Sequence, residues 1–411
     1  MISAKLCIKC KGKLLCGLKK CPILEKHSFY QRADSLVKGT SFQGSSPPSV
    51  FVSWKNYPKI SIAPLTPPEI ENTALMDSPE KWFGLPQERI ISMRQQLIRP
   101  NKRIEATAAS NPSYDLVEMQ ELAMSSSPVL VSVNLKKRLS HSLSFDEGVA
   151  PLGPSGLLKK FDFEENPSIP SKVDYLVSDT NAKTQIALME LYNSKIPVSS
   201  LQKLLSAGTL GVKKNRKLVP TRWSITAVDS NISKELVNER VKHFQQISEF
   251  ELYHSNYLDN DFWVLLLPCQ WSFEQLEAWT PGGSWAANAN QPTIIQDHEF
   301  YAGRKSYASN VEGAYYASRL AVAEHLIKRR RQAACIVFRE IGPNYKIPLG
   351  VWQIRENVRN ALTKKPLSFS SISLTLTFLS RKLKIPIKRY EKQSKLLDFL
   401  QNQKRLSDFT K

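Results

Sequence analysis

The sequence predicts a mixed α/β globular body, with a small cysteine-bearing module before it and a flexible tail after it. At 411 residues, of which 42% are hydrophobic, the chain is long enough to bury a sizeable core. Apolar runs typical of strands are interspersed with amphipathic runs typical of helices. Composition and charge divide the chain into an N-terminal module (1–38), a body (39–395) and a C-terminal tail (396–411).

Positive charge is concentrated at the two ends. The formal net charge is +20, and residues 1–40 hold nine Lys/Arg against two acids while residues 362–411 hold twelve against three. The long middle of the chain therefore carries only +4. Basic ends on a nearly neutral body indicate a polyanionic partner, most commonly nucleic acid. The alternative is that the charge serves only solubility.

Four of the six cysteines fall within the first 21 residues, at Cys7, Cys10, Cys16 and Cys21. A CxxC pair lets two thiolates reach one ion, and two further cysteines nearby can complete a tetrahedral four-sulfur site. A module this short needs the metal in order to fold. We expect structural zinc, with an iron–sulfur cluster as the alternative. No apolar run approaches the length of a membrane span and no signal peptide precedes the module, so we expect a cytoplasmic protein with no membrane partner.

Regular elements are predicted along the body. Helices are expected at residues 86–98, 114–124, 181–193, 197–205, 233–244, 312–326 and 350–359, with basic helical sequence from 388 onward. Strands are expected at residues 50–52, 59–62, 129–134, 224–228, 261–268, 333–338 and 368–379. The pair 181–193 and 197–205 has the outline of a helix-turn-helix, although most helical hairpins do not contact DNA.

Two Gly/Ser segments and a basic stretch are candidates for phosphate binding. Gly44 precedes Ser45 and Ser46, and residues 153–156 repeat a Gly/Ser turn before a lysine pair. Such turns can hold a phosphate with amides and hydroxyls, although most are only turns. Residues 213–229 place Lys217 and Arg222 before a predicted strand that ends at Asp229. If the three segments converge, they line one anion pocket.

Aromatic and charged residues mark the second half of the body. Residues 271–285 carry three tryptophans around a Gly-rich loop, which can stack on bases or close over a core. The helix at 312–326 contains Glu312 and Arg319. Carboxylates and arginines there and beyond are candidates for general-base or metal chemistry and for phosphate binding, or for simple ion pairing. They are Glu340, Arg355 and Glu356.

The last residues contain a short linear motif. Gln403 is followed three places on by Leu406 and three further by Phe409. This spacing matches peptides that insert one helical turn into an apolar groove of a sliding clamp. The second aromatic of such peptides is Thr410 here. We expect the tail to bind a clamp.

Taken together, these motifs resemble the archaeal Nre DNA-repair family (NreA type). The resemblance rests on the four-cysteine cluster, GSSPPSVFV, KNYPKI, GPSGLLKKF, KLVPTRWSITAVD, EGAYYASRLAVAEHL, RRRQAACIVFREI, PLGVWQIRENVR and the tail. It covers nearly the whole chain and implies a cytosolic DNA-repair factor that works with the sliding clamp (PCNA). Residues 52–56 lack the glycine expected in that turn, which argues against phosphate binding there.

Two functions follow as hypotheses. The first is a clamp-tethered repair protein that binds DNA through its basic ends and zinc knuckle. The second is a nucleotide- or DNA-end-processing enzyme that uses Mg²⁺ or Mn²⁺. Its acids would be Asp229, Glu312, Glu340 and Glu356, and its phosphate ligands Arg222, Arg319 and Arg355. A pure adaptor, in which these residues only hold the fold, is the third reading. Carboxylates that converge in one pocket would favour the enzyme, whereas carboxylates that pair separately with arginines would favour the adaptor.

Overall fold

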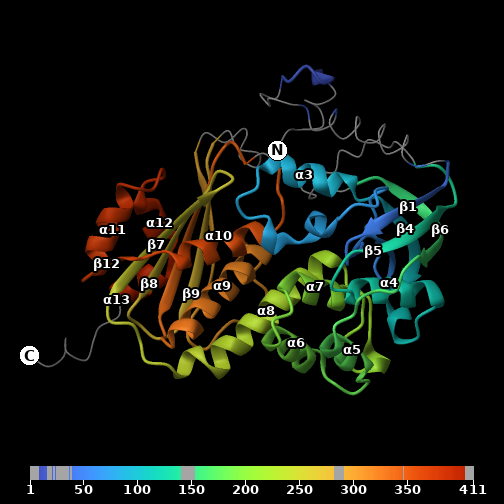
Figure 1. The fold of residues 1–411 in the computed structure, drawn as a ribbon. Coiled ribbons are helices and arrows are strands. Elements are labelled where there is room, and N and C mark those ends of the chain that lie inside the picture. The colour runs from blue at the N-terminus through green and yellow to red at the C-terminus, as the bar shows by residue number, and fades with distance from the viewer. Residues whose placement is uncertain are drawn as a thin grey trace, which may run out of the picture. The chain divides into compact units, whose positions relative to one another are not determined.

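The computed structural model describes residues 9–15, 21, 24, 37, 39–139, 153–281, 291–345 and 347–402, with side chains as far as residue 400. The chain forms two compact units, Ile2–Ile232 and Ser233–Lys411. The boundary between them falls within helix α8 (Thr221–Glu239). These two units are called here the N-terminal and C-terminal units (Figure 1).

The N-terminal unit is built on a mixed six-stranded sheet of order β1-β5-β6-β4-β3-β2, in which β4 and β6 are parallel and the other neighbours antiparallel. Its strands are β1 (Ser41–Ser46), β2 (Val50–Val52), β3 (Lys59–Pro64), β4 (Arg99–Glu105), β5 (Val129–Leu135) and β6 (Ser155–Phe163). Alternate residues of β5, such as Val131 and Val133, are fully buried. They pack with Leu116 and Met119 of helix α4 (Tyr114–Met124), so one sheet face forms the core of this unit.

The other helices of the N-terminal unit are short. They are η1 (Ala74–Asp77), η2 (Pro79–Lys81), α3 (Gln87–Gln96), η3 (Ala106–Ser110), α5 (Ser171–Ser178), α6 (Thr184–Asn193), α7 (Val198–Ser206), η4 (Lys213–Asn215) and the first part of α8. The predicted hairpin of helices is confirmed as α6 and α7.

The C-terminal unit contains a second mixed six-stranded sheet, of order β10-β9-β11-β8-β7-β12, in which only β9 and β11 are parallel. Its strands are β7 (Phe250–Tyr257), β8 (Asn260–Leu267), β9 (Ser272–Trp279), β10 (Thr293–Glu299), β11 (Ala334–Ile341) and β12 (Leu367–Phe369). Its remaining helices are η5 (Val241–His243), α9 (Gly313–Arg329), α10 (Trp352–Thr363), α11 (Ile372–Ser380), α12 (Ile387–Gln393) and α13 (Lys395–Asn402).

Both faces of the second sheet are covered by helices (Figure 1). Leu265 and Phe338 pack with Leu379, Tyr390 and other residues of α11, α12 and α13 on one face. Helices α9 and α10 pack on the opposite face, against β9 and against β7 and β8. Every residue of β8 and β11 is consequently buried, which explains the apolar runs 262–267 and 334–338 within these two strands.

The predicted fold class is confirmed as a mixed α/β protein, and most predicted elements are present. The helices expected at 86–98, 114–124, 312–326 and 350–359 and the strands expected at 50–52, 59–62, 129–134, 261–268 and 333–338 are all confirmed. Within the described residues, no helix is long and apolar enough to cross a membrane.

The strand predicted at residues 224–228 is wrong, because these residues belong to helix α8. Ser224, Val228 and Ile232 are fully buried at intervals of four, which is the period of a helix. The carbonyl of Pro220 accepts hydrogen bonds from the amides of Trp223 and Ser224 and so closes the first turn. Tertiary burial therefore overrides the β-branched character of the local sequence.

Three further predictions are corrected. The Gly/Ser segment ending at Ser46 is the strand β1, and Ser155 and Gly156 begin strand β6. Residues 368–379 form only a short strand, followed by helix α11. Residues 396–402, assigned to the flexible tail, continue as helix α13, in which Leu396 and Leu397 are buried.

Candidate functional site

The four candidate catalytic carboxylates are divided between the two units. Asp229 is buried in the N-terminal unit and accepts a hydrogen bond from Gln202 Nε2 at 3.1 Å. The other three lie in the C-terminal unit. Glu356 on α10 pairs with Arg359 at 2.8 Å, and Glu312 lies exposed directly before α9.

Glu340 has a structural role. Its buried carboxylate accepts the backbone amides of Lys384 and Ile385, each at 2.9 Å, and the hydroxyl of Tyr390 at 3.1 Å. These contacts hold the segment that enters α12. Burial raises the pKa of Glu340, although the three hydrogen bonds oppose that rise. No group of three or more His, Cys, Asp or Glu side chains within the described parts of the chain is placed to hold a metal ion.

The candidate phosphate ligands divide into buried and exposed sets. Arg319 is buried, pairs with Glu299 at 2.6 Å and donates to Ser233 Oγ at 3.0 Å. Arg355 is buried on α10, 3.6 Å from Glu356. Lys217 and Arg222 are exposed in the N-terminal unit. Only these last two are placed to meet a partner on the surface.

Ser45 and Ser46 lie inside strand β1, where their polar atoms are used within the protein. Thr73 Oγ1 donates to the Ser45 carbonyl at 2.7 Å, and Ser46 Oγ donates to the Leu65 carbonyl at 3.1 Å. A Cβ atom at Gly44 would lie 1.9 Å from the Pro67 carbonyl oxygen. The glycine is therefore required for close packing of the backbone, and the segment lacks the form of a phosphate-binding turn.

The second helix of the hairpin, α7, uses its polar side chains to hold the N-terminal unit together. Ser199 donates from its amide and its hydroxyl to Glu80, each at 2.8 Å. Lys203 pairs with buried Asp77 at 3.1 Å. Burial alone would raise the pKa of Asp77, but Lys203 and Arg94 lower it to about 2. This helix consequently lacks the free polar face that reads DNA bases in a helix-turn-helix.

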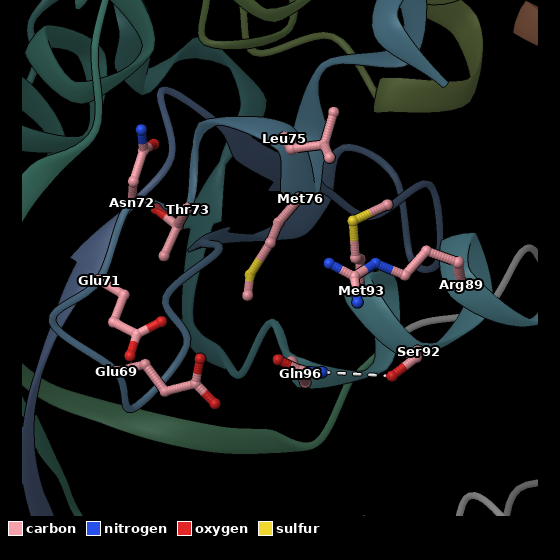
Figure 2. Close-up of a pocket in the computed structure, with 10 residues that line it drawn as sticks. All are labelled: Glu69, Glu71, Asn72, Thr73, Leu75, Met76, Arg89, Ser92, Met93 and Gln96. Carbon is pink, nitrogen blue, oxygen red and sulfur yellow. Dashed lines mark hydrogen bonds between the residues drawn. The ribbon is translucent and has the colours of Figure 1, made fainter. Parts of the chain in front are cut away.

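A cavity of about 310 Å³ lies between helix α3 and the segment that follows β3 (Figure 2). Glu69 and Glu71 stand at one side and Arg89 at the other, with Met76 and Met93 between them. Two carboxylates against one guanidinium give this cavity the wrong balance of charge for a phosphate or for nucleic acid.

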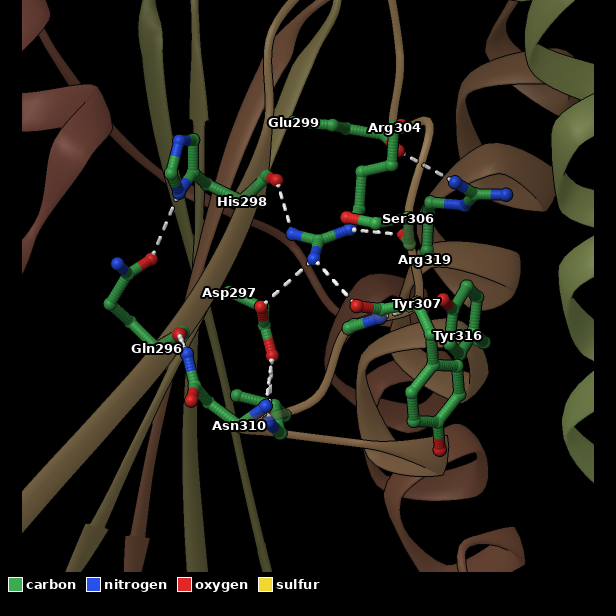
Figure 3. Close-up of polar contacts among 12 residues, drawn as sticks. Gln296, Asp297, His298, Glu299, Arg304, Ser306, Tyr307, Asn310, Tyr316 and Arg319 are labelled. Carbon is green, nitrogen blue, oxygen red and sulfur yellow. Dashed lines mark hydrogen bonds and ion pairs between the residues drawn. The ribbon is translucent and has the colours of Figure 1, made fainter.

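Polar contacts in the C-terminal unit fix the loop between β10 and α9 (Figure 3). Asp297 pairs with Arg304 at 3.1 Å and accepts the amides of Asn310 and Val311, each at 2.8 Å. Arg304 also donates to the carbonyls of His298 and Tyr307. Asp297 and Arg304 therefore stabilise the loop, as paired charges inside a protein usually do.

The tryptophan-rich segment is divided between the core and the undescribed part of the chain. Trp271 is fully buried and its indole donates to Glu299 at 3.0 Å, so it cannot stack on a base. Trp279 ends strand β9 and is half-buried, and Trp285 lies outside the described residues. Exposed aromatic rings occur instead at Trp54, Tyr57 and Trp223 in the N-terminal unit, where we had not predicted them.

Of the four predicted metal ligands, Cys7 and Cys16 lie outside the described residues. Cys10 is buried, and its Sγ atom accepts a hydrogen bond from the Leu15 amide at 3.2 Å. Cys21 is half-buried. An amide directed at a cysteine sulfur is the arrangement that stabilises a thiolate ligand, so the part of the site that is described fits a thiolate-bound metal.

Two mixed six-stranded sheets with helices, preceded by a cysteine-bearing N-terminus, define a mixed α/β protein. The chain belongs to the archaeal Nre family. The family description "Archaeal Nre, N-terminal" matches residues 15–286, and "Archaeal Nre, C-terminal" matches residues 299–409.

Curated relatives match over most of their length. The chain is 37% identical over 391 residues to DNA repair protein NreB of Archaeoglobus fulgidus, covering 95% of this chain and 96% of the relative. It is 38% identical over 385 residues to NreA of the same organism, covering 93% and 95%. Identity to NreA of Haloferax volcanii is 36% over 342 residues, covering 81% of each chain. No solved structure matches the chain.

Proposed function

We propose that this protein is a cytoplasmic DNA-repair factor that binds DNA and works with the sliding clamp. The observation that carries the proposal is the 36–38% identity, over 81–95% of the chain, to proteins named DNA repair protein NreA or NreB. The concentration of positive charge at the two ends supports it, since neutralised phosphates supply affinity that does not depend on sequence.

The N-terminal cysteines form a zinc knuckle in this proposal. Cys7, Cys10, Cys16 and Cys21 hold the ion, and the lysines between them present positive charge toward DNA. The hydrogen bond from the Leu15 amide to Cys10 Sγ supports Cys10 as a thiolate ligand. When bound, zinc supplies the folding energy that so short a segment cannot obtain from a core of its own.

The C-terminal peptide with Gln403, Leu406 and Phe409 binds the clamp in this proposal. The peptide lies outside the described residues, but it follows directly from helix α13, which ends at Asn402. Buried Leu396 and Leu397 attach that helix to the core of the C-terminal unit. A short peptide leaving a fixed helix raises the effective concentration of the whole protein at a clamp-loaded site.

Clamp binding is tested by pull-down of the full chain with the sliding clamp of the same organism. A deletion of residues 403–411 and the variant Phe409→Ala should lose binding, whereas Ser407→Ala, between the two anchors, should keep it. Circular dichroism of each variant should match the wild type, so that a loss of binding is not confused with a loss of folding. Binding that persists after the deletion would refute the clamp assignment.

The enzymatic alternative receives no support from the arrangement of the candidate residues. Asp229, Glu340 and Glu356 each have hydrogen-bond or ion-pair partners within their own unit. A screen with Mg²⁺ and Mn²⁺ on nucleotides and damaged DNA ends tests this alternative directly. Turnover by the wild type that Glu356→Gln abolishes would favour the enzymatic alternative over the proposed function.

A further inference from the structure

We propose that the surface formed by Trp54, Tyr57 and Trp223 binds an unpaired nucleic-acid strand by stacking on its bases. We call these three residues the stacking surface. The inference rests on the proposed function for its expectation that the strand is DNA. It specifies which part of the protein meets the strand and which form of nucleic acid that part accepts.

The three rings are exposed, and two of them are in contact with each other. Trp54, Tyr57 and Trp223 are 50%, 44% and 46% exposed. The ring centroids of Tyr57 and Trp223 are 5.2 Å apart, with their planes inclined by 55°. The Tyr57 amide approaches the Trp54 carbonyl at 3.4 Å, so Trp54 lies one turn away in the same loop. Single exposed apolar side chains are ordinary, but a group of large aromatic rings left in water marks an interaction surface.

Hydrogen bonds between distant segments fix this surface. The Val52 amide, at the end of β2, donates to Thr221 Oγ1 at 2.8 Å, which attaches the start of α8 to the edge of the sheet. Ser206 Oγ lies 3.2 Å from the same oxygen. The loop itself is closed by the bond from the Ser53 amide to the Ser61 carbonyl at 2.9 Å. The rings therefore stand on a preformed scaffold, which lowers the entropy cost of binding.

Exposed cations lie on the same segments of the chain as the rings. Lys55 and Lys59 lie on the β2–β3 loop and the start of β3, and Arg222 lies directly before Trp223. The Ala106 amide binds the Pro58 carbonyl at 2.9 Å and the Leu218 amide binds the Ala106 carbonyl at 2.8 Å, which brings exposed Lys217 beside the loop. The first turn of α8, with its partial positive charge, is part of the same surface. Glu105 is an exposed negative charge in the same region, and it lies opposite Lys59 in the register of β3 and β4.

Aromatic rings among cations fit an unpaired strand better than a duplex. In a duplex both faces of each base are covered by its neighbours, and the grooves offer only base edges. An unpaired base has a free face for a ring, and the flanking phosphates reach the surrounding lysines and arginine. A protein partner would need acidic residues to match the same cations, which makes it the alternative that the experiment must exclude.

The experiment measures binding of the full chain to three fluorescent probes by anisotropy: dT20, a 20-base-pair duplex and rU20. Trp223→Ala and Tyr57→Ala should each weaken binding to dT20 by roughly 5- to 150-fold, the effect of losing one stacked base. Trp223→Phe should keep most of the wild-type affinity for dT20, because an aromatic ring remains to stack on a base. Tyr114→Ala is the control, since Tyr114 is a tyrosine that is still more exposed, at 72%, but lies beside the acid Glu118. Arg222→Ala should reduce the salt slope for dT20 by about 0.7.

Three results would overturn the inference. Unchanged dT20 binding in Trp223→Ala and Tyr57→Ala would show that the rings do not stack. Equal losses of affinity for dT20 and for the duplex in these variants would show that the surface does not select unpaired strands. Tighter binding of rU20 than of dT20 would identify the ligand as RNA in place of DNA. In the first two cases the proposed function still holds if the wild type binds DNA. A wild type that binds no DNA would refute both the stacking surface and the proposed function.

Discussion

The carboxylate of Glu274, on strand β9, accepts a hydrogen bond from the backbone amide of Lys395 at 2.7 Å. The Ser394 hydroxyl and the Leu396 amide donate to the same carboxylate. One buried acid therefore satisfies the first amides of α13, as a capping residue does from within a helix. Glu340 performs the same task for the segment before α12. Two acids of the sheet thus attach the helices that lead to the C-terminal peptide.

The first prediction concerns this attachment. Glu274→Ala removes the acceptor of the Lys395 amide and of the buried Leu396 amide, so we expect the C-terminal unit to lose about 2 kcal/mol of stability. Chemical denaturation measures the loss, and limited proteolysis should show earlier cleavage around α13. Glu249→Ala, at an exposed position before β7, is the control and should change neither. Equal stability of the two variants would contradict the capping role.

The second prediction concerns the pH dependence of stability. Burial, reinforced by the charge of Arg329, lowers the pKa of His325 from 6.5 to about 4. Because the folded pKa lies below the unfolded one, the stabilisation is complete above pH 6.5 and is lost as the pH falls toward 4. The loss from this group is about 3 kcal/mol. In His325→Gln the unfolding free energy should fall less steeply over this pH window, and a slope identical to the wild type would refute the assignment.

Much of the fold was predictable because burial leaves a direct trace in the sequence. Strands β8 and β11 are covered on both faces and contain the apolar runs 262–267 and 334–338, and α9 matches the helix expected at 312–326. Helix α8 was mistaken for a strand in part, because Ile225, Thr226 and Val228 have strand propensity. Pro220 before Thr221 was the available signal, since proline commonly precedes or begins a helix.

The site was less predictable because it depends on contacts between distant residues. Sequence reasoning singled out Arg222 and Arg319 alike, yet Arg319 is neutralised by Glu299 and only Arg222 is exposed. The stacking surface needs Tyr57 beside Trp223, and no local pattern indicates that the Val52 amide meets Thr221. Spacing within a motif reveals the type of chemistry, whereas the partners of each charge follow from the tertiary fold.

The third prediction separates a structural glycine from a phosphate-binding one. Gly44→Ala would place a Cβ atom 1.9 Å from the Pro67 carbonyl oxygen, so the backbone must shift. We expect a loss of about 3 kcal/mol in the N-terminal unit, at the upper end for overpacking. Gln43→Ala, exposed on the same strand, should be nearly neutral. A Gly44→Ala variant of normal stability that loses binding of inorganic phosphate would favour the rejected phosphate-turn reading.

The fourth prediction concerns the cysteine cluster. Purified protein should contain one zinc per chain by elemental analysis, and Cys10→Ser should lose it, because a serine hydroxyl is a poor replacement for a thiolate in a four-sulfur site. Cys269→Ser is the matched control, since that cysteine lies just beyond β8 in the C-terminal unit and should leave the zinc content unchanged. Iron with visible absorbance in the wild type would identify an iron–sulfur cluster instead. Wild-type protein that contains neither zinc nor iron would refute the metal site, because so short a segment is expected to fold only with a metal bound.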